Sequence, residues 1–387
     1  MKACIHPRID WTEVTDPAGL GPRWQALEAR ADGSFFQSWD WVGCQAETRL
    51  AGARLLSATQ DGRDVALALL GRRGQALHLG ASGIAALDSI YVEHNGVLVE
   101  RGRPDLLGAC YAALRPRGRA RLVLPGVGQA DLDAAGASGG VIARLKTQPA
   151  PFVDLTRPFL DSLSPGTRYQ LRRSARSYRR HGALQAEPAG TAVQAGRWLD
   201  ALAVLHQAHW TARGRPGAFA RPEFLAFHQA LIARAWPRAQ LLRVRAGDTV
   251  IGYLYDFRFR GSVLSYQSGF AYAEAGPHEK PGMTCHYLAI EQAAAAGFAR
   301  YDFLAGQDRT KTSLGSGSVP LHWAELVARW SPRGMIGRLR ATLAPALSPA
   351  LSPALALGLA TASEIRRRTL GPRAPDPLSS LSHRDPA

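Results

Sequence analysis

The chain of 387 residues has 46% hydrophobic and 20% charged residues, and 47 basic against 31 acidic residues give a formal net charge of +16 at pH 7. These proportions are typical of a globular protein and exclude a disordered chain, a collagen and a small disulfide-rich scaffold, while the length predicts two domains. The four cysteines lack CxxC spacing, the N-terminus lacks an apolar signal-peptide core, and no uncharged apolar run reaches the ~18 residues of a spanning helix, so we expect a reduced, cytoplasmic protein.

The first 150 residues alternate apolar runs with turn signals, as a mixed α/β unit does. Ser38 is suited to cap a helix that begins within 35–42, and Asp61-Gly62 joins two apolar runs as a hairpin turn. In chain order we expect that helix, strands at 53–60, 63–70, 75–80 and 90–99, a helix at 104–115, and a strand at 121–124 closed by Pro125-Gly126.

A segment rich in Gly, Ala and Pro follows at 125–151, and we place a domain boundary near its end. The boundary divides the chain into an N-terminal unit at 1–150, a C-terminal unit at 151–330 and a basic tail at 331–387. Proline at every fourth position within the tail excludes a regular helix there, and we expect the tail to be partly disordered.

The second unit has the clearer patterns. We expect a strand at 152–155, helices at 165–181, 192–212 and 222–235, strands at 240–246, 249–259 and 262–270, a helix at 284–296 and a strand at 301–304. The last strand, helix and strand predict a right-handed crossover between parallel strands. Because the helix start after Pro281-Gly282 leaves backbone N–H groups unpaired, it is suited to binding phosphate. The alternative is an ordinary crossover that binds no phosphate.

Three strings resemble the GNAT-superfamily acyltransferases: Gln37-Ser-Trp-Asp-Trp41, the block at 206–219 that begins His-Gln-Ala-His-Trp, and the block at 301–311, Tyr-Asp-Phe-Leu-Ala-Gly-Gln-Asp-Arg-Thr-Lys. More narrowly, they are similar to the cellulose-biosynthesis-type (CelD/BcsL-like) acetyltransferases, which are relatives of the FemAB aminoacyltransferases. The resemblance is closest over 152–325, is weaker over 30–150 and does not reach the tail.

The resemblance implies two tandem GNAT-like units of α/β fold with mixed sheets that face each other, the first degenerate and on the acceptor side. It implies that the second unit binds acetyl-CoA or another acyl-CoA, with the pantetheine between two splayed parallel strands. From the residues themselves we expect no metal. The pyrophosphate would lie on Lys280, Gly282, Met283 and Thr284, and backbone amides at Gln267, Ser268 and Gly269 would stabilise the oxyanion.

Other side chains are candidates for catalysis and acceptor binding. Asp302 and Asp308 would orient the acceptor or accept its proton, and Lys311 would hold an anionic group. The alternatives are a structural carboxylate at a helix cap or strand end for Asp302, and an exposed ion pair for Asp308 and Lys311. His209 is either a general base or a core histidine, and no third ligand accompanies it and His206 for a metal. On the acceptor side the candidates are Trp210, Glu93, His94 and Asn95.

The helix segment at 168–180 carries six arginines and no acidic residue. A solvated face is the simple interpretation. The functional one is contact with CoA phosphates, a nucleotide-linked sugar, tRNA or an anionic membrane surface, and no DNA-reading motif accompanies it.

Together these features predict an acyltransferase that moves an acetyl or other acyl group from acyl-CoA to an amine or hydroxyl of a polar acceptor, a small molecule or glycan of the cell envelope or of polysaccharide synthesis. One alternative is a FemAB-like enzyme that uses aminoacyl-tRNA. The other is a catalytically inactive scaffold, suggested by Thr310 where the resemblance expects a tyrosine. We expect the protein in the cytoplasm, either free or at the inner face of the membrane.

Overall fold

A computed structural model of the chain describes residues 7–336. Its N-terminal half contains β1 (Arg8–Glu13), α1 (Pro17–Glu28), η1 (Phe35–Gln37), α2 (Trp39–Thr48), β2 (Arg54–Gln60), β3 (Arg63–Arg73), β4 (Ala76–Leu79), η2 (Leu87–Ile90), β5 (Leu98–Val99), α3 (Pro104–Leu114), β6 (Arg121–Val127) and α4 (Gln129–Ala137). The predicted cap is confirmed, because the Ser38 side chain accepts a hydrogen bond from the Trp41 amide at the start of α2. The predicted hairpin of β2 and β3 is confirmed as well.

The long strand β7 (Gly140–Asp154) leads into the C-terminal half. That half contains α5 (Phe159–Ser162), α6 (Pro165–Tyr178), η3 (Arg179–His181), β8 (Leu184–Pro188), α7 (Ala192–Thr211), η4 (Ala218–Ala220), α8 (Pro222–Ala235), β9 (Ala239–Ala246), β10 (Thr249–Phe259), β11 (Ser262–Phe270), α9 (Pro281–Ala295), β12 (Arg300–Asp302), α10 (Arg309–Leu314) and β13 (Gly317–Ala328). The predicted helices and strands of this half are present at nearly the expected positions.

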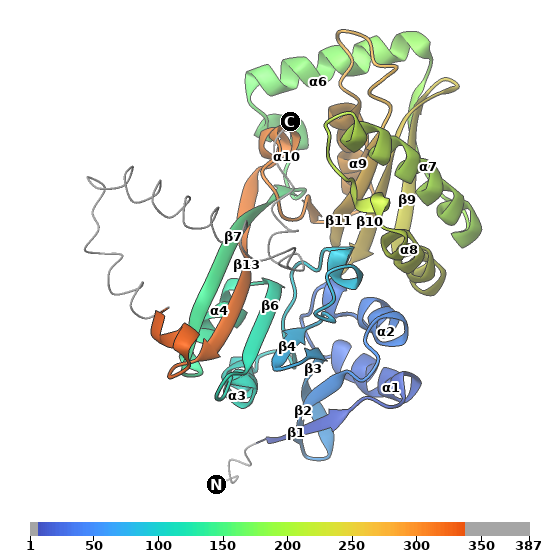
Figure 1. The fold of residues 1–387 in the computed structure, drawn as a ribbon. Helices are drawn as coiled ribbons and strands as arrows, with labels where there is room; N and C mark the ends of the chain where they lie inside the picture. Colours follow the sequence, from blue (N-terminus) through green and yellow to red (C-terminus); the bar gives the residue numbers. More distant parts are fainter. Residues whose placement is uncertain (1–6, 337–387) are drawn as a thin grey trace, which may run out of the picture.

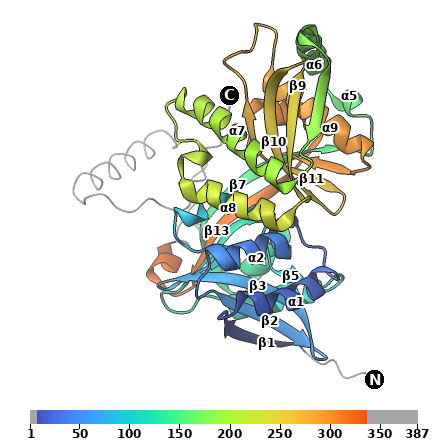
Figure 2. The same cartoon turned by 90° about the vertical axis from the view of Figure 1, so that its right-hand side faces the viewer.

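One mixed sheet runs through both halves, in the order β1-β2-β3-β4-β6-β13-β7-β12-β11-β10-β9-β8, with β5 attached to β3 (Figure 1). The mixed α/β fold is therefore confirmed. On one face the helices α1, α2, α8 and α7 follow one another in contact, while α9 packs against β10 and β11 (Figure 2). The helix layer and the sheet thus join the two halves into one body.

The last strand, β13, joins the halves most directly, because it lies between β6 of the N-terminal half and β7. It pairs with β7 from Gly317 opposite Phe152 to Ala328 opposite Gly140, and Figure 1 shows the two strands side by side. The expectation of a strand that starts at residue 152 is therefore wrong, since β7 starts at Gly140. The predicted boundary falls inside this strand, and the division into two units stays a prediction.

The prediction of a strand over 90–99 is also wrong. Only Leu98–Val99 is a strand. Tyr91 and His94 have positive φ angles of 44° and 47°, which interrupt an extended backbone. The strand predicted at 121–124 does not stop at Pro125-Gly126 but continues to Val127. Most of the predicted tail, at 337–387, lies outside the described residues.

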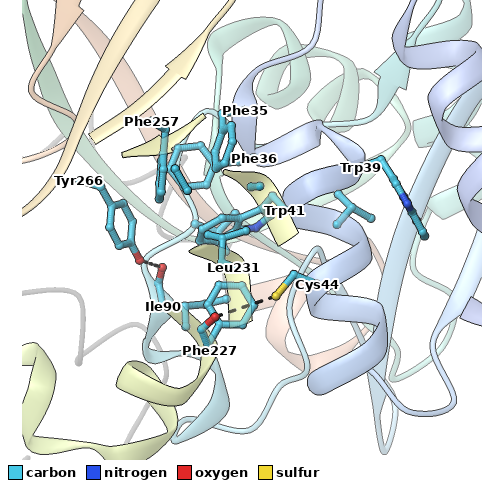
Figure 3. Close-up of a cluster of buried hydrophobic side chains, with 14 of the residues drawn as sticks. Phe35, Phe36, Trp39, Trp41, Cys44, Ile90, Phe227, Leu231, Phe257 and Tyr266 are labelled. Carbon is cyan, nitrogen blue, oxygen red and sulfur yellow. Dashed lines mark hydrogen bonds between the residues drawn. The ribbon is translucent and has the colours of Figure 1, made fainter. Parts of the chain in front are cut away.

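A cluster of aromatic side chains fills the space between the halves (Figure 3). Phe35 stacks on Phe257 with ring centroids 4.2 Å apart, and Trp41 packs edge-on against Phe227 at 5.1 Å. Each such ring pair contributes about 0.5–1.5 kcal/mol beyond its buried area. The Tyr266 hydroxyl of β11 donates to the carbonyl oxygen of Ile90, so the cluster also ties the C-terminal half to the loop that follows β4 (Figure 3).

Each half contains a parallel strand pair that separates after a few residues. In the N-terminal half, β4 pairs with β6 over Ala76–His78 only. The Asn95 side chain occupies the gap beyond this pairing, where its amide donates to the carbonyl oxygens of Leu79 and Pro125, both at 3.0 Å. This gap is therefore filled by the protein's own chain.

Candidate active site

The second parallel pair, β11 and β12, is the predicted crossover, and it separates after three pairs of residues. The pairing runs from Ser262 opposite Arg300 to Leu264 opposite Asp302, whereas β11 continues along β10 to Phe270. A β-bulge lies at the point of separation: Tyr266 is the extra residue between Ser265 and Gln267, which face consecutive residues of β10. Bulges of this kind bend a strand and are frequent beside active sites.

A cavity of about 370 Å³ opens at this separation. Its wall is formed by His206, His209, Trp210, Arg213 and Arg215 of α7 and the turn after it, by residues 265–270 and Tyr272, and by His286, Phe303, Asp308, Thr310 and Lys311. The structure thus brings seven predicted site residues to one place: Gln267, Ser268, Gly269, Trp210, His209, Asp308 and Lys311.

On one side, α7 is held against β11 by His206. Its Nδ1 donates to the carbonyl oxygen of Ser268 at 2.9 Å, and its Nε2 accepts the Ala218 amide at 3.3 Å. Because a Cβ on Gly269 would overlap the backbone of Leu202, only glycine permits this close approach of the helix. His206 therefore positions the wall of the cavity, with both ring nitrogens used.

His209, one turn along α7, stacks on Tyr272 with ring centroids 4.4 Å apart. Its ring also receives a hydrogen bond from Arg213, 2.7 Å from Nδ1. Burial and the charge of Arg213 lower the pKa of His209, which favours the neutral imidazole. His209 thus lines the cavity, and its role as a general base stays a prediction.

The opposite side of the cavity is the start of α10. Asp308 caps this helix, since its Oδ1 accepts the Lys311 amide at 2.9 Å. The Lys311 ammonium donates to the carbonyl oxygen of Ala305 at 3.1 Å. With Arg213 and Arg215, Lys311 gives the wall three cationic side chains against the one carboxylate of Asp308. The cavity therefore favours an anionic ligand.

Asp302, predicted to be catalytic, is enclosed instead, at 3% exposure. Its carboxylate is bound by Arg300 at 2.9 Å, by the Leu304 amide at 2.8 Å and by His94, whose Nε2 lies 3.3 Å away. Burial disfavours its charge, but these partners outweigh it and lower the pKa of Asp302. Asp302 fixes the end of β12 and does not line the cavity.

The three acceptor-side candidates of the N-terminal half also lie away from the cavity wall. Glu93 accepts the Ala305 amide, His94 pairs with Asp302, and Asn95 fills the gap beside β4. All three contacts hold loops in place. The structure does not place these residues at the cavity, because their partners come from distant segments that no local pattern reveals.

The start of α9, predicted to bind pyrophosphate, is covered. The Lys280 amide donates to Ser174 of α6 at 2.8 Å, and the Thr284 hydroxyl lies 2.8 Å from the same oxygen. A Cβ on Gly282 would lie 3.0 Å from the Tyr272 hydroxyl. Lys280, Gly282, Met283 and Thr284 are therefore separated from the cavity wall, and the helix start does not open onto it.

Several residues of the cavity wall were not predicted from the sequence to be functional. Arg213 and Arg215 lie inside the quoted block at 206–219, where their charge was a usable signal. His286 lies on α9 among buried neighbours, and its pattern is that of a core residue. Only the tertiary structure brings it to the cavity.

Within residues 7–336, no group of three or more His, Cys, Asp and Glu side chains is arranged to hold a metal ion. In the same range, no helix has the length and apolar character that crossing a membrane requires.

Residues 165–312 match an acetyltransferase (GNAT) domain family. Among solved structures, the C-terminal domain of a putative lysylphosphatidylglycerol synthetase from Agrobacterium fabrum is similar at 14% identity and a TM-score of 0.51, covering 85% of this chain and 96% of that one. FemX is similar at 11% identity and a TM-score of 0.55, covering 81% and 96%. A tandem GNAT protein from the clavulanic acid biosynthesis pathway has 13% identity and a TM-score of 0.41, covering 82% and 98%.

No curated protein matches the chain. The fold is that of GNAT proteins, and the matched domain makes the chain an acyltransferase by enzyme class. The parting of β11 and β12 lies within the matched residues.

Proposed function

We propose that the protein transfers an acyl group from an acyl-CoA thioester to an amine or hydroxyl of a polar acceptor, in the cavity beside β11. The observation that carries this proposal is the separation of β11 and β12 at the Tyr266 bulge, directly beside a cationic cavity. From the narrower sequence resemblance we propose an acceptor of the cell envelope or of polysaccharide synthesis.

Backbone geometry at Ser268 supports a place for the thioester. Its carbonyl group points away from β10, because it accepts from His206 on α7. In an antiparallel ladder the N–H of a residue points to the same side as its carbonyl. The Ser268 amide is thus directed to the open edge, where a donor can stabilise the oxyanion of the tetrahedral intermediate; removing such a donor typically costs about 10²–10³ in rate.

The cations on the wall support an anionic co-substrate. Arg213, Arg215 and Lys311 come from both sides of the cavity and are suited to phosphates or a carboxylate. We propose that they hold the CoA phosphates, in place of the covered start of α9. This proposal replaces the helix-terminus site with side-chain contacts.

A second candidate donor, aminoacyl-tRNA, is favoured by the outer face of α6. Arg168, Arg172, Arg173 and Arg176 line a groove of about 490 Å³ together with Tyr169, which is 63% exposed. Rows of arginine beside an exposed aromatic ring suit a nucleic acid backbone with unstacked bases. The positive charge of the same face would also attract it to an anionic membrane surface.

Ligand-induced thermal stabilisation tests these donors against each other. A ligand that binds only the folded state at 100 times its Kd adds about 2.7 kcal/mol to stability and raises the Tm. We expect acetyl-CoA and CoA to raise the Tm saturably, and [14C]acetyl-CoA to label an acceptor. Salt-sensitive binding of aminoacyl-tRNA without any effect of CoA would replace the first donor by the second. Binding of neither by folded protein would favour the inactive scaffold.

A further inference from the structure

A file of polar side chains leads from the cavity into the sheet. It begins at His286 on α9, whose Nδ1 lies 3.1 Å from the hydroxyl of Tyr301 on β12. The Tyr301 hydroxyl interacts in turn with the side chain of Ser265 on β11. Ser265 faces Asp256 across the β10–β11 pair and hydrogen-bonds with its carboxyl group. The file is therefore His286, Tyr301, Ser265 and Asp256.

The carboxylate at the inner end sets the direction of these hydrogen bonds. An ionised Asp256 only accepts, so Ser265 donates to it, Tyr301 donates to Ser265, and His286 donates to Tyr301 through Nδ1. In that arrangement Nε2 of His286 carries the lone pair. Asp256 is 5% exposed, and its Oδ1 has no hydrogen-bond partner among residues 7–336, an arrangement that is costly if the carboxyl group has only a structural role.

The outer end of the file meets the cavity. The His286 ring lines the cavity wall, and within the described part of the chain its Nε2 neither has a hydrogen-bond partner nor is sealed from solvent. Phe303 and Phe270 pack edge-on against the ring, with centroids 5.2 Å and 5.7 Å away. These rings fix its plane and leave one nitrogen free to act.

We propose that His286 is the general base of the transfer and that Tyr301, Ser265 and Asp256 are positioning residues that fix its tautomer. This inference rests on the proposed function. As the acceptor nitrogen or oxygen bonds to the thioester carbonyl, its proton passes to Nε2 of His286. The C–S bond then breaks, and the departing thiolate takes the proton back from the imidazolium, which leaves a free thiol, the acylated acceptor and a neutral His286.

The electrostatic environment sets the charge states of the two ends of the file. Burial lowers the pKa of His286 to about 4; the nearby Asp308 carboxylate works against this, and the Lys311 ammonium works with it. The imidazole is thus neutral at pH 7, and Nε2 carries its lone pair, although the lowered pKa makes it a weaker base than an exposed histidine. Burial raises the pKa of Asp256 to about 7, against the hydrogen bond of Ser265 and the charge of Arg258. Ionisation of Asp256 near neutral pH therefore completes the file.

Nitrogen NMR of the imidazole rings tests the tautomer without any activity. In the wild type above pH 8 we expect His286 to be protonated at Nδ1 and bare at Nε2. Tyr301→Phe removes the hydroxyl and Asp256→Asn introduces a donor at the inner end, so each should shift His286 toward the other tautomer. Tyr111→Phe is the matched control, because Tyr111 is also a buried tyrosine bonded to a buried carboxylate, Asp131, at 2.8 Å. It should leave His286 unchanged.

Kinetics of thioester turnover then test the base. His286→Gln should lower kcat by about 10²–10⁴-fold with little change in KM. In wild-type protein kcat/KM should rise with pH through about 7, and Asp256→Asn should lose this rise. A His286→Gln rate within twofold of wild type would overturn the base, even if the tautomer is as expected. If the wild type turns over no thioester, the proposed acyl-CoA donor is wrong. Independently of turnover, a wild-type His286 protonated at Nε2 would overturn the proposed positioning of His286 by Tyr301, Ser265 and Asp256.

Discussion

His94 and Asp302 form a buried ion pair between the two halves of the protein, with Nε2 and Oδ2 3.3 Å apart. His94 belongs to the loop after β4, and Asp302 is the last residue of β12, where the parallel strands part. The same loop carries Glu93, which accepts the Ala305 amide, and Ile90, which accepts the Tyr266 hydroxyl. The N-terminal half thus holds both edges of the opening that forms the cavity.

The first prediction concerns this ion pair. His94→Ala should destabilise the fold by about 2 kcal/mol, because it removes the close contact of Nε2 with the buried Asp302 carboxylate, which Arg300 still compensates. Burial opposes the charge of His94, but the hydrogen bond and charge of Asp302 prevail and raise its pKa above 6.5. The stabilisation should therefore be full below pH 6.5 and be lost as pH rises through the folded-state pKa.

Urea unfolding at pH 5.5 and pH 9 measures the difference between wild type and His94→Ala. We expect a larger difference at the lower pH. Arg101→Ala, which removes an exposed ion pair with Asp32, is the control and should have a small effect at both. Equal His94→Ala effects at the two pH values would contradict the ion pair as the source of stability.

The second prediction compares Gly269 of β11, which α7 packs against, with Gly196, which lies within α7. A Cβ on Gly269 would overlap the Leu202 backbone, so Gly269→Ala should push α7 from β11 and cost about 1–3 kcal/mol. Gly196 lies within α7, and a Cβ added there would meet no neighbouring element within 4 Å, so Gly196→Ala should instead stabilise the protein by up to about 1 kcal/mol. Unfolding free energies measure both, and a neutral Gly269→Ala would refute the close approach.

The third prediction concerns the filled gap in the N-terminal half. Asn95→Ala removes the hydrogen bonds to the carbonyl oxygens of Leu79 and Pro125, at a cost of about 3 kcal/mol. Gln129→Ala removes an exposed side-chain bond to Asp133 and should cost little. Chemical denaturation measures the two costs, and an Asn95→Ala cost as small as the control would show that the gap does not depend on this side chain.

Helix caps and turn residues predicted most of the helices and strands, because each of these signals acts on residues close to it in the sequence. Ser38 caps α2, and Asp61-Gly62 turns the β2–β3 hairpin. The signals failed where distant segments decide. The loop after β4 takes its shape from distant partners such as Asp302. The start of α9 is covered by α6, which lies more than a hundred residues earlier in the sequence, and by Tyr272, about ten residues earlier. The same reason hid His286, whose helix pattern is that of a core residue.

The fourth prediction concerns where the CoA phosphates bind, either at the side chains of the cavity wall or at the start of α9. The two lysines of the predicted site distinguish these alternatives. Lys311 lines the cavity, whereas Lys280 is exposed and bonds to Gln170 on the surface of α6. If side chains of the wall hold the CoA phosphates, Lys311→Ala should weaken CoA binding about tenfold, which corresponds to about 1.4 kcal/mol, and Lys280→Ala should leave it unchanged. Isothermal titration calorimetry at low salt measures both affinities. The reverse order of effects would return the phosphates to the start of α9 and would require α6 and Tyr272 to move away from it.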